Sequence, residues 1–166
     1  MTDSGLPAQY FVPNVMCVQT IWMDETTPLC IFRMMKSNID DEYWQYATTH
    51  LRKFLKWIKK HGYKYHFLFD LHEVDSIPLD RLYGLQQYLR KKRDVLLAHL
   101  HSSAIITQSH MLQMVLNNAF DMWPPTRPFK MFVHSYDAND ARDENTGIPD
   151  ATYSEVLRHL HANKLA

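Results

Sequence analysis

Short apolar runs alternate along this chain with longer segments whose apolar positions have helical spacing. The densest run, Lys64–Leu71, carries Asp70 near its end and is followed by the polar residues His72–Pro78 and by an amphipathic segment. A dense apolar run that leads into an amphipathic helix is typical of a buried parallel strand and its crossover. The pattern therefore predicts an α/β domain built around residues 64–71.

Two segments rich in β-branched and aromatic side chains predict an antiparallel hairpin before this strand. They are residues 15–23 and 29–35, with a turn at residues 24–28 between them. Residues 103–108 and 129–135 are expected to add two strands parallel to the central one. The predicted sheet is mixed and consists of an N-terminal hairpin plus three parallel strands.

Apolar positions at helical spacing predict four helices. Ser37 and Asn38 form the expected N-cap of the first helix, which runs from Ile39 to about His61 and is stopped by Gly62. Its buried face is expected to hold Tyr43, Ala47, Leu51, Phe54, Leu55 and Ile58. The other helices are expected at residues 79–100, with a bend near residues 93–94, and at residues 110–122 and 153–165.

The ends of the predicted domain have a different composition. Residues 1–14 contain two prolines and a glycine and are expected to form an irregular N-terminal arm. Residues 137–151 carry five acidic side chains and predict a solvated acidic loop, after which Thr152 caps the C-terminal helix of residues 152–165. A single α/β domain over residues 15–166 is therefore predicted, with about four helices covering its mixed sheet.

The two cysteines fall on the two strands of the predicted hairpin. With the turn at residues 24–28, Cys17 is expected to face Met35, and Cys30 to face Trp22. The thiols are then too far apart for a disulfide, and reduced thiols predict a cytoplasmic location.

Bulk composition argues against several classes of function. Eighteen Lys and Arg residues balance eighteen Asp and Glu residues, so nucleic-acid binding through net charge is not expected. Apolar runs fall short of the roughly 20 residues that a membrane-spanning helix needs, so no membrane span is expected. The spacing of the histidines and cysteines predicts no metal site, and the four glycines form no phosphate-binding motif.

Serine, histidine and aspartate residues fall at the predicted carboxyl ends of the parallel strands, where open α/β sheets bind ligands. These residues are Asp70, His72, Ser109, His110, His134 and Ser135. They permit a hydrolase hypothesis, but no Gly-x-Ser-x-Gly elbow or glycine-rich oxyanion loop accompanies them. Ser109 is instead expected to cap a helix, and Asp70 to accept backbone N–H groups, so neither enzymatic activity nor a cofactor is predicted.

Ten of the eighteen cationic side chains lie in or beside the first two predicted helices. They are Arg52, Lys53, Lys56, Lys59, Lys60, Lys64 and the run Arg90–Arg93. If both helices cover one face of the sheet, these side chains form a positive surface suited to an acidic protein partner. The alternative is two solvated helix faces.

Aromatic side chains on and near the same helices are more numerous than one core face can hold, and aromatic enrichment is typical of interfaces. Examples are Trp44, Tyr46, Trp57, Tyr83, Tyr88 and Trp123. Packing into the core is the alternative explanation. The predicted partner-binding residues are Trp44, Lys53, Lys56, Trp57, Arg90, Lys91, Lys92 and Arg93.

Three segments together carry a resemblance to a known family. Residues 40–55 begin acidic and end basic, residues 66–82 join an apolar strand to a turn, and residues 102–134 contain Ala-Ile-Ile, Pro-Pro and Phe-Lys-Met-Phe. In this order they resemble the small STAS-like α/β domains, which include STAS and CRAL-TRIO-like proteins, over residues 15–137. The resemblance implies a non-enzymatic domain that acts through protein–protein contact as a regulator, adaptor or accessory subunit.

Regulatory STAS proteins carry an Asp-Ser-Ser-Gly-Leu run that contains a phosphorylated serine. The corresponding residues here are Pro78–Leu82, which include neither serine of that run. Ser76 lies a few residues earlier and is the candidate modification site. The resemblance therefore implies partner binding without the family's phosphoserine switch.

The protein partner could also be a second copy of the chain, which would give a homo-oligomer. Two other hypotheses stay open beside protein–protein contact. The CRAL-TRIO likeness implies a small-ligand or lipid-binding module, which needs a cavity lined by Phe, Met and Leu. A chain of this length is expected to leave little room for such a cavity. A hydrolase would need Ser109 hydrogen-bonded to His72 or His110, with Asp70 behind it. An exposed aromatic patch without a pocket would favour protein–protein contact.

Overall fold

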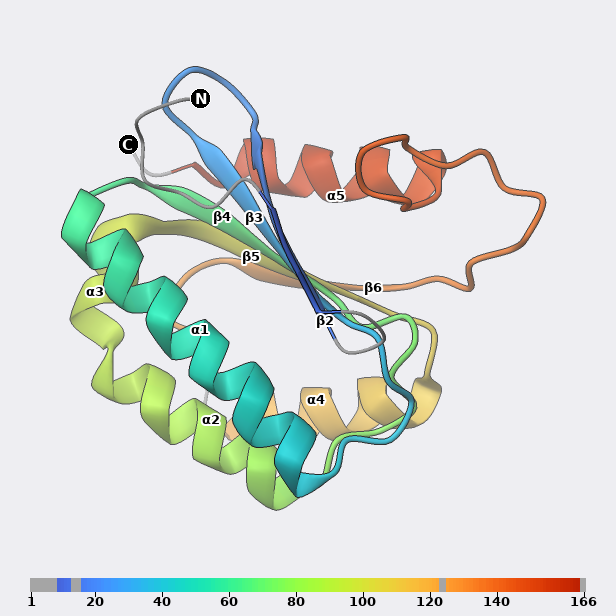
Figure 1. The fold of residues 1–166 in the computed structure, drawn as a ribbon, viewed down its shortest axis with the longest axis horizontal. Helices are drawn as coiled ribbons and strands as arrows, with labels where there is room; N and C mark the ends of the chain where they lie inside the picture. The colour runs from blue at the N-terminus through green and yellow to red at the C-terminus, as the bar shows by residue number, and fades with distance from the viewer. Residues whose placement is uncertain (1–8, 13–15, 123–124, 165–166) are drawn as a thin grey trace.

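The computed structural model describes residues 9–12, 16–122 and 125–164, and these form one six-stranded sheet with helices on both faces (Figure 1). The strands lie in the order in which they occur along the chain. They are β1 (Gln9–Val12), β2 (Met16–Trp22), β3 (Pro28–Met34), β4 (Tyr65–Asp70), β5 (Leu100–Thr107) and β6 (Phe129–Val133). β1, β2 and β3 pair antiparallel, whereas β3 to β6 are parallel.

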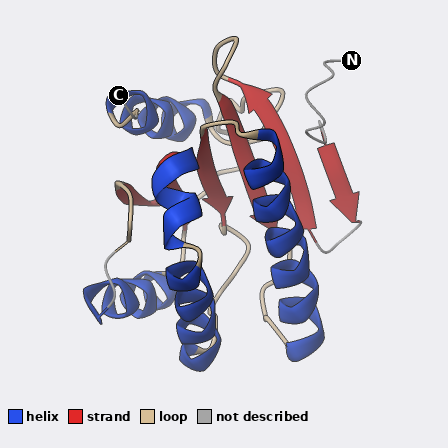
Figure 2. Ribbon diagram, turned by 90° about the vertical axis from the view of Figure 1, so that its left-hand side faces the viewer, coloured by secondary structure: helices blue, strands red, loops and turns tan. Residues whose placement is uncertain are grey.

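Helices connect the parallel strands and cover the sheet. They are α1 (Asp41–His61), α2 (Leu79–Lys91), α3 (Arg93–His99), α4 (His110–Met122) and α5 (Asp150–Ala162). Because β3 to β6 follow one another in the sheet and crossovers are right-handed, α1 to α4 lie on one face and α5 on the other (Figure 1). Figure 2 shows α1 beside α2 and α3, in front of the strands. The predicted α/β class with a mixed sheet is confirmed.

The sheet separates two layers of core. Phe67 and Ile105 face α1, α2 and α4, whereas Leu68 and Ile106 face α5. Burial on both faces explains why β4 reads as a dense apolar run in the sequence. The six residues predicted for the inner face of α1 are all buried: Tyr43, Ala47, Leu51, Phe54, Leu55 and Ile58.

Two predictions about the N-terminal half are wrong. Residues 9–12, assigned to an irregular arm, form the edge strand β1, which pairs with β2. In the hairpin, Cys17 lies opposite Arg33, and Cys30 opposite Thr20, because Met23 N–H donates to the Thr27 carbonyl and closes a tighter turn than expected. The cysteines still do not face each other, and Cys30 is a buried free thiol.

The first helix starts later than predicted. Its N-cap is Asp40, whose carboxylate accepts the Tyr43 N–H at 2.8 Å, rather than Ser37 or Asn38. Asn38 is engaged elsewhere, in a parallel bridge to Ser76. The predicted stop at Gly62 is confirmed, and this residue has a left-handed φ of 73°.

The second predicted helix is divided at Lys92, close to the predicted bend, into α2 and α3. Leu82, Leu96 and Leu100 of this segment are buried, whereas Leu85 and Leu89 are half-buried. The chain then enters β5 at Leu100, three residues earlier than predicted.

The C-terminal segment is more ordered than the expected solvated loop. Ile148 is fully buried and Thr146 nearly so, because the Asp143 carboxylate accepts the Thr146 N–H and folds this part of the chain inward. α5 begins at Asp150, directly after Pro149, so Thr152 is a buried residue within the helix and not its cap.

Candidate functional site

A cavity of about 200 Å³ lies between the sheet and helices α1, α2 and α4. Its wall is almost wholly apolar and combines side chains from the strands, such as Phe67 and Ile105, with side chains from the helices, such as Leu51, Leu82 and Leu116. The core thus leaves room for a small cavity, below the roughly 300–1,000 Å³ that ligand pockets usually have. Periodicity identified the wall residues on α1 but could not give the distance between the helices and the sheet.

Two buried polar atoms belong to residues that line this cavity. The side chain of Tyr65 is fully buried, and its hydroxyl has no hydrogen-bond partner among the described residues. Gln86 donates from Nε2 to the Ala119 carbonyl at 3.0 Å, which leaves its Oε1 without a described partner. Burial raises the pKa of the Tyr65 hydroxyl, so it stays protonated and can donate a hydrogen bond.

The cavity approaches the surface beside the end of α2. Of the residues that line it, only Arg90 and Pro125 are exposed, and the others are buried or half-buried. Arg127, which also lines it, donates from Nε to the Leu100 carbonyl at 3.0 Å and so joins the segment before β6 to the start of β5. Cationic side chains therefore flank the entrance but not the aromatic interior.

A second cluster of polar side chains lies at the carboxyl end of β4, on the face covered by α5. Asp70 is buried and accepts from Arg33 Nε at 2.9 Å and contacts His72 Nδ1 at 2.7 Å. Tyr136 adds its hydroxyl to the same carboxylate at 3.3 Å, and its ring stacks on His72. Burial alone would raise the pKa of Asp70, but the contacts with His72 and Arg33 outweigh it and lower that pKa.

Only part of this cluster could be found from the sequence. Asp70 and His72 were predicted to share this edge, whereas Arg33 and Tyr136 were missed because they lie far away along the chain. The available signal was Arg33 itself, the one charged residue in the apolar run at residues 29–35. Asp70 accepts mainly from side chains rather than from the expected backbone N–H groups, of which His72 supplies one at 3.3 Å.

The remaining strand-end residues do not complete a hydrolase site. Ser109 accepts the Leu112 N–H, as predicted for an N-cap, and donates its hydroxyl to the Asp75 carbonyl at 2.6 Å rather than to a histidine. His134 pairs with Glu155 at 3.0 Å, away from Asp70. His110 and Ser135 are exposed. A serine nucleophile next to His72 is therefore not formed by the predicted residues.

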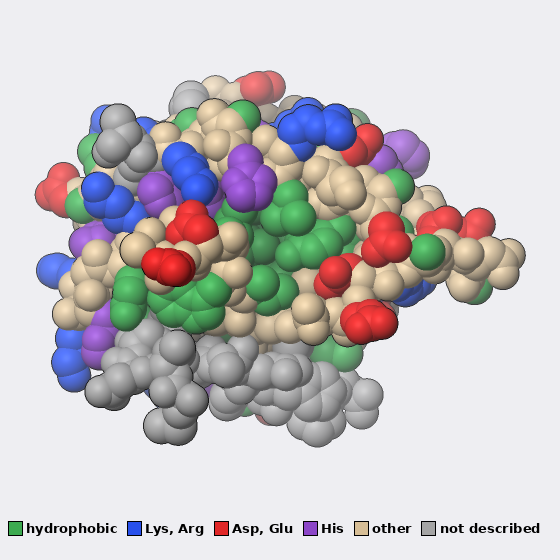
Figure 3. Space-filling model, turned by 90° about the horizontal axis from the view of Figure 1, so that it is seen from above, with side chains coloured by type: hydrophobic (Ala, Val, Ile, Leu, Met, Phe, Trp, Pro, Cys, Tyr) green, Lys and Arg blue, Asp and Glu red, His purple; other side chains and the backbone are tan. Residues whose placement is uncertain are grey.

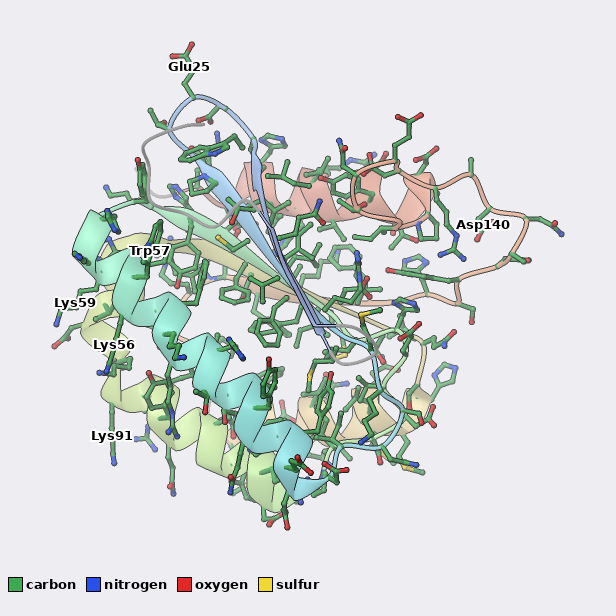
Figure 4. All side chains as sticks on the ribbon, viewed as in Figure 1. Glu25, Lys56, Trp57, Lys59, Lys91 and Asp140 are labelled. Carbon is green, nitrogen blue, oxygen red and sulfur yellow. The ribbon has the colours of Figure 1, made fainter. Side chains whose placement is uncertain are left out.

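The predicted basic residues do gather on one face, because α1, α2 and α3 cover the same side of the sheet. Arg52 stacks over the Tyr88 ring at 4.9 Å, which joins α1 to α2. Figure 4 shows Lys56, Lys59 and Lys91 pointing away from the body at the same edge of the molecule. Within the described ranges, no carboxylate forms an ion pair with Lys53, Lys56, Lys91 or Arg93. We call Lys53, Lys56, Lys91 and Arg93 the basic surface.

Of the other predicted partner-binding residues, Arg90 is exposed, whereas Trp44, Trp57 and Lys92 are less accessible. Trp44 and Trp57 are half-buried and pack against the core, which is the alternative explanation for the aromatic excess. Trp44 also lines the cavity, and the Trp57 ring packs at a tilt against His61 within α1. Lys92 is half-buried near the Tyr88 ring.

The candidate modification site, Ser76, is half-buried in the segment before α2.

Away from the basic surface, the molecule has a different charge distribution. Viewed from above, acidic side chains gather over the protruding loop between β6 and α5 (Figure 3). Asp140 marks this loop in Figure 4, far from the basic surface.

Comparisons with family models, curated proteins and solved structures find no match to the chain. The resemblance to STAS-like domains therefore stays a prediction. Among the helices that the structure describes, none is long and apolar enough to cross a membrane. In the same residues, no group of three or more His, Cys, Asp or Glu side chains is placed to hold a metal ion.

Proposed function

We propose that the protein binds a small, mainly apolar molecule in the cavity between its sheet and α1, α2 and α4. The observation that carries this proposal is the volume of about 200 Å³ within an aromatic and aliphatic wall. An apolar cavity of about 150 Å³ is large enough to take up benzene. The fitting ligand is thus a compact molecule somewhat larger than benzene, which agrees with the small-ligand side of the CRAL-TRIO likeness.

The burial of the aromatic residues supports this choice over protein–protein contact. The two tryptophans expected to form a contact surface, Trp44 and Trp57, pack against the core, and one of them helps to line the cavity. The discriminating feature named for a binding module, a cavity with Phe, Met and Leu in its wall, is present: Phe67, Met34 and Leu82 all line it.

Thermal unfolding with and without toluene tests the proposal. Toluene should raise the midpoint of wild type, because a ligand that binds only the folded state stabilises it. The double variant Ala47→Leu/Ala119→Leu fills the cavity from α1 and α4 and should abolish the shift. Ala104→Leu is the matched control, since Ala104 is buried in the layer beneath α5, and it should keep the shift. An equal shift in all three proteins, or none in wild type, would contradict the proposal.

A second candidate function is contact with an acidic protein partner, and the basic surface is the observation that favours it. Its cations lie on adjacent helices and lack acidic partners among the described side chains. Native mass spectrometry of gently purified protein tests this function. The charge reversals Lys53→Glu, Lys56→Glu and Lys91→Glu should release the partner, whereas Arg158→Glu on α5 should not. A bare monomer of the wild-type protein would contradict it.

A further inference from the structure

The strand β6 forms one edge of the sheet, and β5 is its neighbour on the inner side. The two strands pair in a continuous parallel register. The Ser103 N–H donates to the Pro128 carbonyl at 3.0 Å, and the His134 N–H donates to the Thr107 carbonyl at 2.9 Å. These two hydrogen bonds lie at opposite ends of β6 and show which of its residues bond to β5.

The alternation of a parallel strand gives the direction of the other backbone groups in β6. Each residue directs its N–H and its C=O to the same side, and the next residue directs both to the opposite side. Because Pro128 and His134 bond to β5, the even-numbered residues between them do so as well. Phe129, Met131 and Val133 therefore direct their backbone groups to the free edge, where no residue in the described part of the chain pairs with them. Such a row of backbone groups is a template for another strand.

A groove of about 580 Å³ lies between this edge strand and α5. Its volume is within the roughly 300–1,000 Å³ of most ligand pockets. The strand supplies residues 130–134, and the helix with its last turn supplies Glu155, Arg158, His159, Ala162 and Asn163. None of these residues lines the cavity beneath α1, α2 and α4, so the groove is a separate site.

The charges in the groove favour an acidic ligand. Lys130 and Arg158 are exposed, and no carboxylate of the described residues forms an ion pair with either. The Lys130 ammonium group lies 5.1 Å from the centroid of the Phe132 ring, on the side of the sheet that α5 covers. The one carboxylate among the residues that line the groove, Glu155, contacts His134 Nε2 at 3.0 Å. An acidic side chain next to Lys130 would therefore meet positive charge without an acidic partner.

The other face of β6 is apolar. Phe129 and Met131 pack against the core beneath α1, α2 and α4, and the strand alternation places Val133 on the same face. All three side chains are half-buried, so apolar side chains of an added strand would cover more of their surface. A strand next to β6 thus meets positive charge on one face and apolar side chains on the other.

We propose that β6 and α5 bind an extended segment of a partner protein in which acidic and apolar side chains alternate. The segment adds to the sheet as a new edge strand, and its backbone bonds to Phe129, Met131 and Val133 provide affinity. Its acidic side chains lie in the groove near Lys130 and Arg158, and its apolar side chains lie on the opposite face. This site is distinct from the ligand cavity and from the basic surface on the helices.

Binding of a short peptide, measured by fluorescence anisotropy, tests the charge preference. The probe is a labelled seven-residue peptide in which Val and Glu alternate, and a peptide of alternating Val and Lys is its counterpart. Wild type should bind the Val-Glu peptide at least about tenfold more tightly than the Val-Lys peptide. Lys130→Glu should weaken binding of the Val-Glu peptide about fivefold, because an exposed ion pair is lost. Lys56→Glu, on the basic surface, is the matched control and should leave binding unchanged.

A proline on the edge tests strand addition separately. Met131→Pro removes an outward N–H but no hydrogen bond to β5, an orientation in which edge strands tolerate Pro, and it should weaken binding about tenfold. Amide hydrogen exchange gives a second readout. In free wild type, the amides of Phe129, Met131 and Val133 should exchange faster than those of Lys130 and Phe132, and the bound peptide should protect them.

The possible results separate this proposal from its alternatives. Absence of binding, or binding that survives both Lys130→Glu and Met131→Pro, would overturn it. Equal binding of the two peptides would overturn the acidic class of ligand, and loss of binding in Lys56→Glu would place the peptide on the basic surface instead. Protection of the outer amides that rises with protein concentration in the absence of peptide would show that a second copy occupies the edge, which would also overturn the proposal. Stabilisation by toluene is independent of all these results.

Discussion

Arg33 and Asp70 lie directly opposite each other on the parallel strands β3 and β4, and the Arg33 Nε donates to the Asp70 carboxylate at 2.9 Å. Arg33 also donates to the Thr146 carbonyl, so this pair joins the centre of the sheet to the segment that precedes α5. The parallel register places the two charges side by side, because Arg33 and Asp70 both lie at the carboxyl ends of their strands.

Loss of one partner of this pair should destabilise the fold. Asp70→Asn leaves the Arg33 guanidinium beside a neutral group in a largely buried site, which should lower the free energy of unfolding by about 3 kcal/mol. Urea denaturation measures the loss. The double variant Arg33→Met/Asp70→Leu should recover much of it, because no buried charge is then left unpaired. A double variant as unstable as Asp70→Asn would contradict this account.

Acid should destabilise the protein through a buried histidine. Burial and, next, the charge of His101 lower the pKa of His66 to about 3. The ordinary pKa of a histidine is about 6.5, so below pH 6.5 His66 is protonated in the unfolded chain. In the folded protein it stays neutral down to about pH 3. Stability should therefore fall between these values by up to about 1.4 kcal/mol per pH unit.

Denaturation at several pH values between 7 and 4 measures this slope. His66→Gln removes the titrating group and should flatten the slope in that window, whereas His110→Gln, at an exposed position at the start of α4, should leave it unchanged. An unaltered slope in His66→Gln would show that other groups cause the acid sensitivity.

Two glycines should respond to alanine with opposite signs. Gly62 ends α1 with a φ of 73°, where a Cβ atom is strained, so Gly62→Ala should cost about 1 kcal/mol. Gly84 is exposed within α2, and a Cβ atom there meets nothing within 4 Å, so Gly84→Ala should stabilise by about 0.5–1 kcal/mol. Thermal unfolding of the two variants checks the signs, and equal signs would contradict the assigned backbone conformations.

Filling the cavity should also change stability. Ala119→Leu adds carbon atoms to space beside α4 and should stabilise the ligand-free protein by about 1 kcal/mol. Ala104→Leu adds the same atoms to the packed layer beneath α5 and should destabilise by about 1–3 kcal/mol. Urea denaturation of both variants without ligand compares the two layers. Destabilisation by Ala119→Leu comparable to that by Ala104→Leu would mean that the cavity wall is already close-packed.

Much of the fold could be predicted because it is set by local periodicity. The inner face of α1, the stop at Gly62 and the Ser109 cap all follow from residues within one or two turns of each other. The hairpin register could not be predicted in the same way, since it depends on the hydrogen bond between Met23 and Thr27 rather than on composition. Ser37, Asn38 and Asp40 all have side chains that can cap a helix, but Asn38 pairs with Ser76, and Asp40 caps α1.

The candidate site was less predictable than the fold. Apolar wall residues such as Leu51 and Phe67 look in the sequence like ordinary core residues, and only the placement of three helices against the sheet leaves space between them. Gln86 could have been noticed as a polar residue between Leu85 and Leu89 on the inner face of α2. Tyr65 could not, because an aromatic residue at the start of a buried strand is usual.

The most direct test of the central claim is a two-dimensional methyl NMR spectrum of the wild-type protein titrated with phenol. The binding account predicts saturable shifts of the methyl groups of Leu51, Leu82 and Leu116, which line the cavity, with little change at Leu68 and Leu160 in the layer beneath α5. Shifts of equal size in both layers, or none at saturating phenol, would contradict it.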